Sequence, residues 1–339
     1  MKFVRTWSLL LIATLLFSLS CKQSNTTTQV TDHPAFKNPE VRSITDKIAG
    51  DTDNANLYYQ RGNMLHRMEH DTLALEDFKK AATLDSTKAE YFSAVADLMF
   101  EHKDISGSLP WLERAVNLNP DDQLAQLKIA KMQVFLKDYP KAFATINKVL
   151  RKNAVNPEGY FLKGLIYKDL KDTSKAISSF QTTIQVDPNY KEAIIQLGLL
   201  YAAKKDPTAL QYFDNAWKVD TNDVTPLYAK GMFYQEQGKL ELAKQEYKKC
   251  VVHRTDYTKA IFGIGWILLN QDSLEKAWRQ FDLVTRLEPT DAEAYYNRGL
   301  SSELMDKNTE ALQDYKQALT FAPRYQEAID GVKRVQRKL

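Results

Sequence analysis

The sequence predicts an all-α protein built as a solenoid of eight two-helix repeats, and three recurring series of residues carry this prediction. The first series consists of small residues spaced by 33 or 34 positions: Ala74, Ser108, Ala142, Ala176, Ala209, Ala243, Ala277 and Ala311. The second series is glycine or alanine and lies upstream of the first: Gly62, Ala96, Ala130, Gly164, Gly198, Gly231, Gly265 and Gly299. The third is aromatic or branched and lies just downstream: Phe78, Leu112, Ile146, Phe180, Phe213, Tyr247, Phe281 and Tyr315. A fixed period of this length is typical of a repeat architecture.

Each series has a role in packing. Small residues on both helices let two antiparallel helices approach closely. The large residue four positions after the alanine lies on the same helix face and fills the gap toward the next repeat. Proline lacks an N–H and ends the second helix of several repeats, at Pro120, Pro188, Pro289 and Pro323. The pattern therefore predicts one helical hairpin in each repeat.

The unit resembles the tetratricopeptide repeat, most fully from Ala294-Tyr-Tyr-Asn-Arg-Gly299 through Ala318 and Pro323. The resemblance covers residues 55–325 and implies a right-handed α-solenoid. The expected repeats are 55–88, 89–122, 123–156, 157–190, 191–223, 224–257, 258–291 and 292–325. The fifth is one residue short near Asp206-Pro207, and the second and third are the least typical.

Both ends of a solenoid need covering, because terminal repeats expose an apolar face. Residues 39–50 carry Val41, Ile44 and Ile48 at helical spacing and are expected to form an N-terminal half-repeat. Residues 326–339 are expected to form a C-terminal cap helix. Its apolar side holds Ile329, Val332, Val335 and Leu339, and its basic side holds Lys333, Arg334, Arg337 and Lys338. A membrane contact of the basic side is the alternative to a solvated face.

Residues 1–20 read as a signal peptide, because Lys2 and Arg5 precede an apolar run too short to span a bilayer. Cys21 after the small Ser20 resembles a bacterial lipobox, although Ser18 stands where leucine is commoner. That resemblance implies lipidation of Cys21, and residues 21–38 are then a lipidated flexible tether. Ordinary secretion of a soluble binding protein is the alternative, and the mass of the mature N-terminus separates the two.

Composition and motifs argue against several other functions. Removing residues 1–20 takes away Lys2 and Arg5 and no acid, so the formal charge falls from +3 to +1, too low for a nucleic-acid-binding surface. His66-Arg-Met-Glu69-His70 spells a zinc-peptidase pattern. The repeat alignment places His70 in the turn after the helix of His66, so the two rings are not expected to share a face. We predict no enzyme activity, no cofactor and no metal site, and we interpret Cys250 as a structural thiol.

The resemblance also implies that the first helix of each repeat lines a concave groove with its fifth and ninth positions. In repeats four to eight these positions are all apolar: Phe161, Leu165, Ile195, Leu199, Tyr228, Met232, Phe262, Trp266, Tyr296 and Leu300. A contiguous apolar strip predicts a site for an apolar segment of another protein, with Phe262 and Trp266 as anchors. Alternatively, these side chains pack against neighbouring helices and leave little exposed. In the first repeat the fifth and ninth positions are Tyr59 and Asn63. Because the fifth position is not lysine, a lysine-based clamp for a C-terminal carboxylate is not expected.

The sequence as a whole therefore predicts a membrane-anchored scaffold of the bacterial cell envelope, most simply an outer-membrane lipoprotein that faces the periplasm. Its partners are expected to be other envelope proteins, and its membrane contact is the N-terminal lipid. A zinc-dependent peptidase built on His66, Glu69 and His70 is the competing enzymatic hypothesis, which a metal assay on purified protein decides. The partner's identity, the pathway and the oligomeric state are left open.

Overall fold

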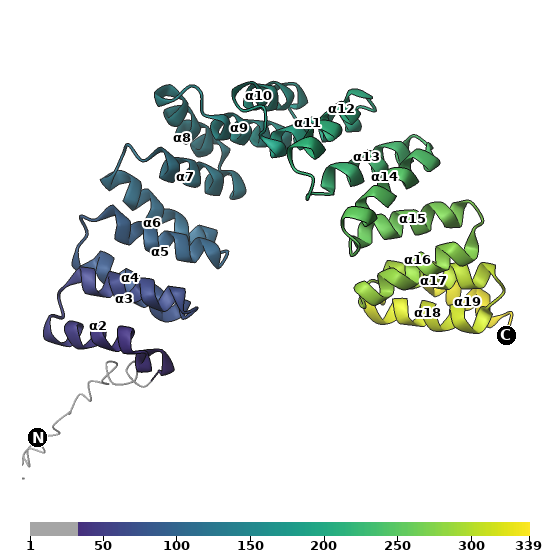
Figure 1. Cartoon of the computed structure of the whole chain (residues 1–339), viewed down its shortest axis with the longest axis horizontal. Helices are drawn as coiled ribbons and strands as arrows, with labels where there is room; N and C mark the ends of the chain where they lie inside the picture. Colours follow the sequence, from purple (N-terminus) through teal and green to yellow (C-terminus); the bar gives the residue numbers. More distant parts are fainter. Residues whose placement is uncertain (1–32) are drawn as a thin grey trace, which may run out of the picture. The chain divides into compact units, whose positions relative to one another are not determined.

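The computed structural model describes residues 33–339, and every regular element in that range is a helix (Figure 1). This confirms the predicted all-α class. The described chain forms two compact units, the first ending at Asp121 and the second spanning Asp122–Leu339. In both units the first helix of a repeat, helix A, is followed by an antiparallel helix B.

The first unit holds a short 3-10 helix, a capping helix and two hairpins. Its elements are η1 (Pro34–Lys37), α2 (Pro39–Gly50), α3 (Ala55–Arg67), α4 (Asp71–Leu84), α5 (Ala89–Glu101) and α6 (Ile105–Leu118). Helix α2 packs against α3, and α4 packs against both α3 and α5. Each element is thus covered by its neighbours along the chain.

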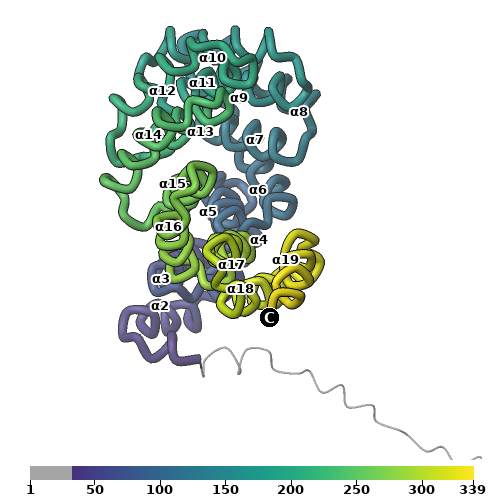
Figure 2. The backbone as a smooth tube through the Cα atoms, turned by 90° about the vertical axis from the view of Figure 1, so that its right-hand side faces the viewer, coloured from purple at the N-terminus to yellow at the C-terminus, as the bar shows by residue number. Residues whose placement is uncertain are grey.

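The second unit holds six hairpins and a final single helix, which follow one another in chain order (Figure 2). Its elements are α7 (Gln123–Phe135), α8 (Tyr139–Lys152), α9 (Pro157–Asp169), α10 (Thr173–Val186), α11 (Lys191–Ala203), α12 (Thr208–Val219), α13 (Thr225–Glu236), α14 (Leu240–His253), α15 (Thr258–Asn270), α16 (Leu274–Leu287), α17 (Ala292–Leu304), α18 (Asn308–Phe321) and α19 (Gln326–Gln336). Helix α12 is two residues shorter than α10 and begins after Pro207.

The small and large residues found in the sequence meet across each hairpin. A Cβ atom added to Gly164 would lie 2.4 Å from the ring of Phe180, and one added to Gly231 would lie 2.4 Å from the ring of Tyr247. Both rings are buried, as are the alanines at the start of the B helices. Glycine is thus required at these sites because the aromatic ring of helix B occupies the volume of a side chain on helix A.

The turn between the two helices has the same backbone conformation in all eight repeats. The residue at position 15 of each repeat is left-handed, with φ between 55° and 71°. These residues are Glu69, Lys103, Lys137, Lys171, Lys205, Gly238, Asp272 and Asp306. The N–H of the next residue returns to helix A, as that of His70 does to the Leu65 carbonyl oxygen at 2.9 Å. This bond closes a Schellman motif, in which glycine is the usual left-handed residue.

Among these eight turn residues only Gly238 adopts the left-handed conformation without strain. A change to glycine at this position should therefore raise the stability, and a change from glycine should lower it. A left-handed conformation costs a non-glycine residue about 1–2 kcal/mol, although glycine loses more freedom on folding. We expect Lys171→Gly to raise the free energy of unfolding by up to about 1 kcal/mol and Gly238→Ala to lower it by about 1 kcal/mol. Urea denaturation followed by circular dichroism measures both. A neutral Gly238→Ala together with a destabilising Lys171→Gly would contradict this account.

The A helices lie on the inner side of the second unit. Neighbouring A helices touch each other at α7 and α9, at α11 and α13, and at α15 and α17, whereas neighbouring B helices of this unit make no comparable contact. Rows of helices converge on the side with the smaller radius of curvature. The side chains that A helices turn away from their B helices therefore line a concave surface within this unit.

The two ends of the described chain are covered in different ways. The expected tether does not extend to residue 38, because Pro34–Lys37 form η1 and bury Ala35 and Phe36 against Val41 and Leu65. The guanidinium carbon of Arg61 lies 5.3 Å from the centroid of the Phe36 ring, a contact that was not predicted from the sequence. At the other end, α19 is held by Glu303, which accepts bonds from Arg334 and Lys338 at 2.9 and 3.3 Å. Two residues of its basic side are therefore engaged with α17, and a third, Lys333, pairs with Asp330 of α19 itself at 3.4 Å.

Candidate functional site

The ten residues predicted to line the groove all lie on A helices of the second unit, and none of them is fully buried. We call this set the groove stripe. Seven of its members pack in part against buried core clusters: Phe161, Leu165, Tyr228, Phe262, Trp266, Tyr296 and Leu300. The alternative prediction, that these side chains pack against neighbouring helices, therefore holds for part of the groove stripe. Some surface of every member is still accessible.

The aromatic residues at the fifth position make a recurring ring contact. Phe161 packs on Phe180 of helix B and on Tyr190 at the end of its repeat, with centroids 5.6 and 5.0 Å away. Tyr228 does the same with Tyr247 and Tyr257, at 5.5 and 5.6 Å. Such contacts join helix A, helix B and the connection to the next repeat. The fifth-position rings thus hold the repeats together as well as line the groove.

The most accessible part of the stripe lies in repeats five and six. Leu199 and Met232 are 42% and 40% exposed, and they occupy the same ninth position in consecutive repeats. Ile195, one turn before Leu199, is partly exposed. The expected anchors are less open, because Phe262 packs on Phe281 with centroids 5.2 Å apart and Trp266 packs against a buried cluster. The accessible apolar centre therefore lies on α11 and α13, two repeats and one repeat earlier than the anchors predicted from sequence on α15.

Polar side chains along the same helices are largely engaged with one another. The ammonium group of Lys168 donates to the Gln196 Oε1 at 2.7 Å and so joins repeats four and five. Gln235 accepts the hydroxyl proton of Tyr247 at 2.8 Å, and the side-chain amide of Asn270 donates to the carbonyl oxygen of Trp266. Burial is the main reason that the pKa of Lys168 is lowered. Because these polar groups bond to one another, the apolar side chains are the main surface of the groove that is available to a partner.

The histidines of the zinc-peptidase pattern have separate partners. His66 lies in the last turn of α3 and its Nδ1 is 2.8 Å from the carboxylate of Asp71, whose other oxygen is 2.7 Å from His102 Nε2. His70 precedes α4, and its ring stands edge-on to His33 at 5.2 Å. Glu69 is the left-handed turn residue between them. Within residues 33–339, no group of three or more His, Cys, Asp or Glu side chains is arranged to hold a metal ion.

Cys250 has the environment of a structural thiol. Its side chain is fully buried, with Sγ 3.7 Å from the carbonyl oxygen of Val224. Burial raises the pKa of the thiol to about 12, so the reactive thiolate is scarce at neutral pH. The cysteine predicted to carry lipid, Cys21, lies outside the described residues. None of the helices in residues 33–339 combines the length and the apolar character that crossing a membrane requires.

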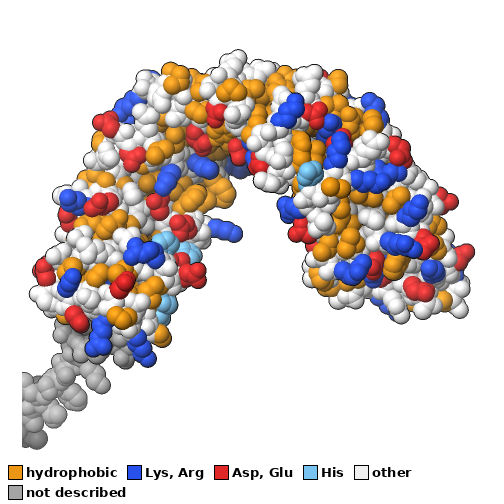
Figure 3. All heavy atoms as spheres, in the orientation of Figure 1, with side chains coloured by type: hydrophobic (Ala, Val, Ile, Leu, Met, Phe, Trp, Pro, Cys, Tyr) orange, Lys and Arg blue, Asp and Glu red, His pale blue; other side chains and the backbone are white. Residues whose placement is uncertain are grey.

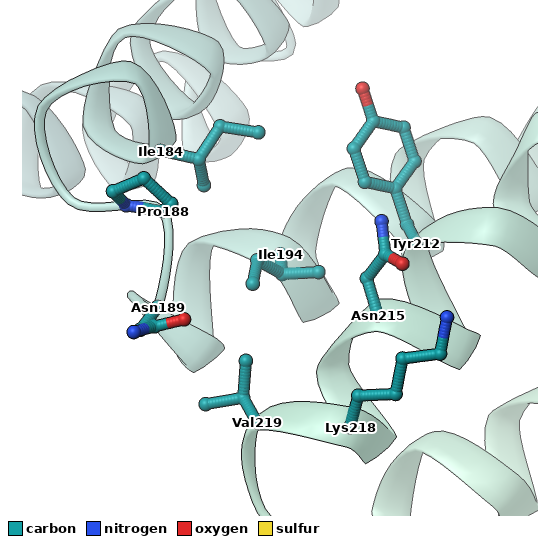
Figure 4. Close-up of a pocket in the computed structure, with 8 residues that line it drawn as sticks. All are labelled: Ile184, Pro188, Asn189, Ile194, Tyr212, Asn215, Lys218 and Val219. Carbon is teal, nitrogen blue, oxygen red and sulfur yellow. The ribbon is translucent and has the colours of Figure 1, made fainter.

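A separate pocket of about 400 Å³ lies beside the shortened α12 (Figure 4). Ile184, Ile194 and Val219 provide its apolar side chains, while Asn189 lies on one side and Asn215 and Lys218 on the other. Ile194 and Ile195 are adjacent on α11 and therefore point about 100° apart around the helix. The pocket is thus distinct from the groove stripe. Over the visible face of the molecule, acidic and basic side chains are interspersed (Figure 3).

Sequence reasoning missed a set of ion pairs between the two helices of a repeat. Arg61 and Asp77 form a bidentate pair with two N···O distances of 2.7 Å, and both side chains are about nine-tenths buried. Arg298 and Asp314 repeat this pair at 2.6 and 3.0 Å. The two members of each pair are sixteen residues apart, a spacing that aligning the repeats could have revealed. These pairs stabilise the hairpins and do not belong to the groove.

Comparisons with known proteins agree with this architecture. A family model described as a tetratricopeptide repeat matches residues 55–88, 157–190, 224–251 and 292–325. The human Superkiller complex protein 3 is 24% identical over 227 residues, which are 63% of this chain and 14% of that protein. The BBSome complex member BBS4 of Bos taurus is 23% identical over 252 residues, 74% of this chain and 48% of the relative. The chain thus spans less than half the length of either relative.

Solved structures show the same fold. The C-terminal part of a TPR repeat-containing protein from Cytophaga hutchinsonii superposes with a TM-score of 0.56 at 17% identity, covering 70% of this chain and 98% of that one. The matched segments coincide with helical hairpins, each consisting of helix A, a left-handed turn and helix B. By these matches the chain contains tetratricopeptide repeats, and its described helical hairpins have the fold of a tetratricopeptide-repeat solenoid.

Proposed function

We propose that this protein is a scaffold that binds other proteins through the groove stripe and is anchored to a membrane of the bacterial cell envelope by a lipid on Cys21. The observation that carries the binding role is the pair of exposed apolar side chains, Leu199 and Met232, on the concave side of the second unit. Apolar surface of this kind, rimmed by polar groups, is characteristic of protein–protein interaction sites. The anchoring role rests on the lipobox resemblance at Ser20-Cys21.

The partner envisaged is an envelope protein that inserts an apolar segment along α11 and α13. Two relatives of this chain have names that place them in assemblies, the Superkiller complex and the BBSome. Membership of an assembly is consistent with a scaffold that holds partners without chemistry of its own. An outer-membrane location facing the periplasm is part of the proposal, and Lys22 after the cysteine agrees with it, because an acid at that place would favour retention in the inner membrane.

The binding role can be tested by placing one charge in the stripe and an equal charge elsewhere. We expect Leu199→Glu to reduce partner capture about tenfold or more, because a carboxylate in the apolar contact must be desolvated without a counterion. Photo-crosslinking in intact cells from position 232, followed by pull-down, measures the captured partner. The matched control is Leu242→Glu, since Leu242 is 41% exposed but lies on helix B of repeat six. Equal capture by both variants would refute binding at the stripe.

A further inference from the structure

The pocket beside α12 lacks an aromatic ring that other repeats supply at the corresponding place. It lies between repeats four and five and has a volume of about 400 Å³, and we call it the α12 pocket. Ile194, the fourth residue of repeat five, lies in the middle of its lining residues and is 3% exposed (Figure 4). In repeats one, two, four and eight the fourth residue is aromatic: Tyr58, Phe92, Tyr160 and Tyr295. Repeat five therefore has an aliphatic side chain where four repeats have a ring.

The aromatic rings at the fourth position contact the same positions that line the α12 pocket. The ring of Phe92 packs on Trp111 with centroids 5.9 Å apart, and the ring of Tyr295 packs on Phe321 at 5.7 Å. Counted from the small residue near the start of helix B, these two neighbours correspond to two lining residues of the α12 pocket, Tyr212 and Val219. The space within the pocket is therefore the space that a ring occupies in those repeats.

Two of the fourth-position tyrosines also donate a hydrogen bond from their hydroxyl group. Tyr58 donates to the carbonyl oxygen of Thr52 at 3.2 Å, and Tyr160 donates to that of Ala154 at 3.1 Å. Each acceptor lies six residues before its tyrosine. The corresponding residue of repeat five is Pro188, which lines the α12 pocket and whose carbonyl oxygen accepts no hydrogen bond from residues 33–339. The pocket is thus bordered by the equivalent of the backbone group that accepts a phenol in the other two repeats.

A cation without an ion-pair partner lies at the edge of the α12 pocket. In repeats one and two, the ammonium of Lys80 and the guanidinium carbon of Arg114 each lie 5.9 Å from the centroid of the fourth-position ring. In repeat five Asn215 takes the place of these cations, and Lys218 follows on the same helix face. Within the described chain Lys218 forms no ion pair or hydrogen bond. Because an ammonium group is attracted to the face of a ring, this edge favours an aromatic ligand over an aliphatic one.

The corresponding sites of the neighbouring repeats are covered by the protein's own side chains. In repeat six, Trp217 takes the place of Ile184 and packs against the core cluster that contains the fourth residue, Leu227. In repeat seven, Leu283 packs against the cluster that contains the fourth residue, Ile261. Repeat three has a buried glutamine at this position. A large apolar side chain thus lies over this region in repeats six and seven, whereas smaller or polar neighbours leave a pocket in repeat five.

We propose that the α12 pocket binds a tyrosine side chain of another protein, with the phenol ring packed on Ile194 and Val219 and the hydroxyl group donating to the carbonyl oxygen of Pro188. The bound tyrosine takes the place that the protein's own Tyr160 has in repeat four. The pocket is separate from the groove stripe, so this site adds a second binding role to the proposed function. A scaffold with both sites holds two segments of its partners at once.

The test uses N-acetyltyrosinamide as the probe and the full-length protein with isotope-labelled isoleucine methyl groups. In nuclear magnetic resonance spectra, Ile184 and Ile194 report binding in the α12 pocket, and Ile195 reports binding in the groove stripe. We expect saturable shifts of the Ile184 and Ile194 signals that exceed any shift at Ile195. N-acetylphenylalaninamide should bind about two- to tenfold more weakly, because it lacks the hydroxyl group that donates to Pro188.

Two variants place a ring of the protein itself in the α12 pocket. Ile194→Tyr supplies a ring and a hydroxyl group, as Tyr160 does in repeat four, and Val219→Phe supplies a ring from a residue that is 37% exposed. Both should weaken binding of the probe about tenfold or more, measured at Ile184, because the new ring occupies the volume that the probe needs. Val252→Tyr adds a ring at a position of α14 that is 77% exposed and should leave binding unchanged. Circular dichroism checks that each variant is folded.

Each contrary result overturns a stated part of this inference. Without saturable shifts at Ile184 and Ile194 up to the solubility limit of the probe, the pocket does not bind a phenol. Shifts confined to Ile195 would place the ring in the groove instead. Equal binding of the two probes would overturn the hydrogen bond to Pro188 and the assignment to tyrosine. A folded Val219→Phe that binds the probe as tightly as the wild type would overturn the site, whereas the groove stripe is tested separately.

Discussion

Replacing Phe180 by alanine should lower the free energy of unfolding of the second unit by about 3–5 kcal/mol, the usual cost of removing a buried phenylalanine ring. The ring is completely buried between α9 and α10, where it faces Gly164 and packs on Phe161. Gly164 has no side chain with which to fill the cavity, so the loss cannot be recovered by a small adjustment. Urea denaturation followed by circular dichroism measures the change.

The matched control is Phe321→Ala in α18, because Phe321 is 37% exposed. We expect it to cost clearly less, about 1–2 kcal/mol, since more than a third of this side chain already faces water and less apolar area is lost from burial. Repeat proteins add the stability of each hairpin to that of its contacts with its neighbours. Loss of Phe180 should therefore also increase hydrogen exchange in α9 to α11 before the rest of the unit. Equal destabilisation by the two substitutions would show that Phe180 is not a packing centre.

The second large effect is expected from breaking the buried ion pair of the first unit. Arg61→Met should destabilise that unit by about 3–5 kcal/mol, because Asp77 is left as a buried charge without a partner. Burial raises the pKa of Asp77 and Arg61 opposes this rise. In the variant the folded state binds a proton more tightly than the unfolded state, so stability increases as the pH falls toward the unfolded pKa. The deficit relative to wild type should therefore be larger at pH 8 than at pH 5.

Two further variants make this prediction specific. The double substitution Arg61→Met with Asp77→Leu should recover much of the loss, since well-packed apolar residues often replace a buried pair at little cost. Arg279→Met removes an exposed pair with Glu275 in α16 and should cost less than about 0.5 kcal/mol. Denaturation curves at both pH values report all three. A double variant as unstable as Arg61→Met alone would mean that the lost ring contacts of Arg61 with Phe36 and Tyr58, not the uncompensated charge, dominate.

The helical hairpins could be predicted from sequence because their packing requirements are local and recur. Gly164 and Phe180, for example, are sixteen residues apart and need only the antiparallel geometry of one hairpin to meet. The left-handed turns were not predicted, because glycine marks the position only at Gly238 and lysine, aspartate or glutamate occupies the other seven. The Schellman hydrogen bond imposes this conformation on residues that do not favour it, and single residues carry no trace of that constraint.

The groove was predictable in its position but not in its accessibility. Helical spacing indicates that Leu199 and Trp266 occupy equivalent positions, yet one is exposed and the other packs against a core cluster. The difference depends on the neighbours of each side chain in three dimensions. The hydrogen bond of Glu158 was overlooked for the same reason, because the Tyr190 hydroxyl that donates it lies 32 residues away in the sequence.

The restriction of contacts to neighbouring hairpins has a mechanical consequence for the second unit. A pulling force on its ends would load one inter-repeat contact after another, because no element ties distant hairpins together. Each hairpin that gives way releases a 34-residue length of chain, or roughly 110–120 Å when fully extended. Such a unit unfolds under tension in steps, one hairpin at a time, and its unfolded hairpins can refold onto those that are still intact.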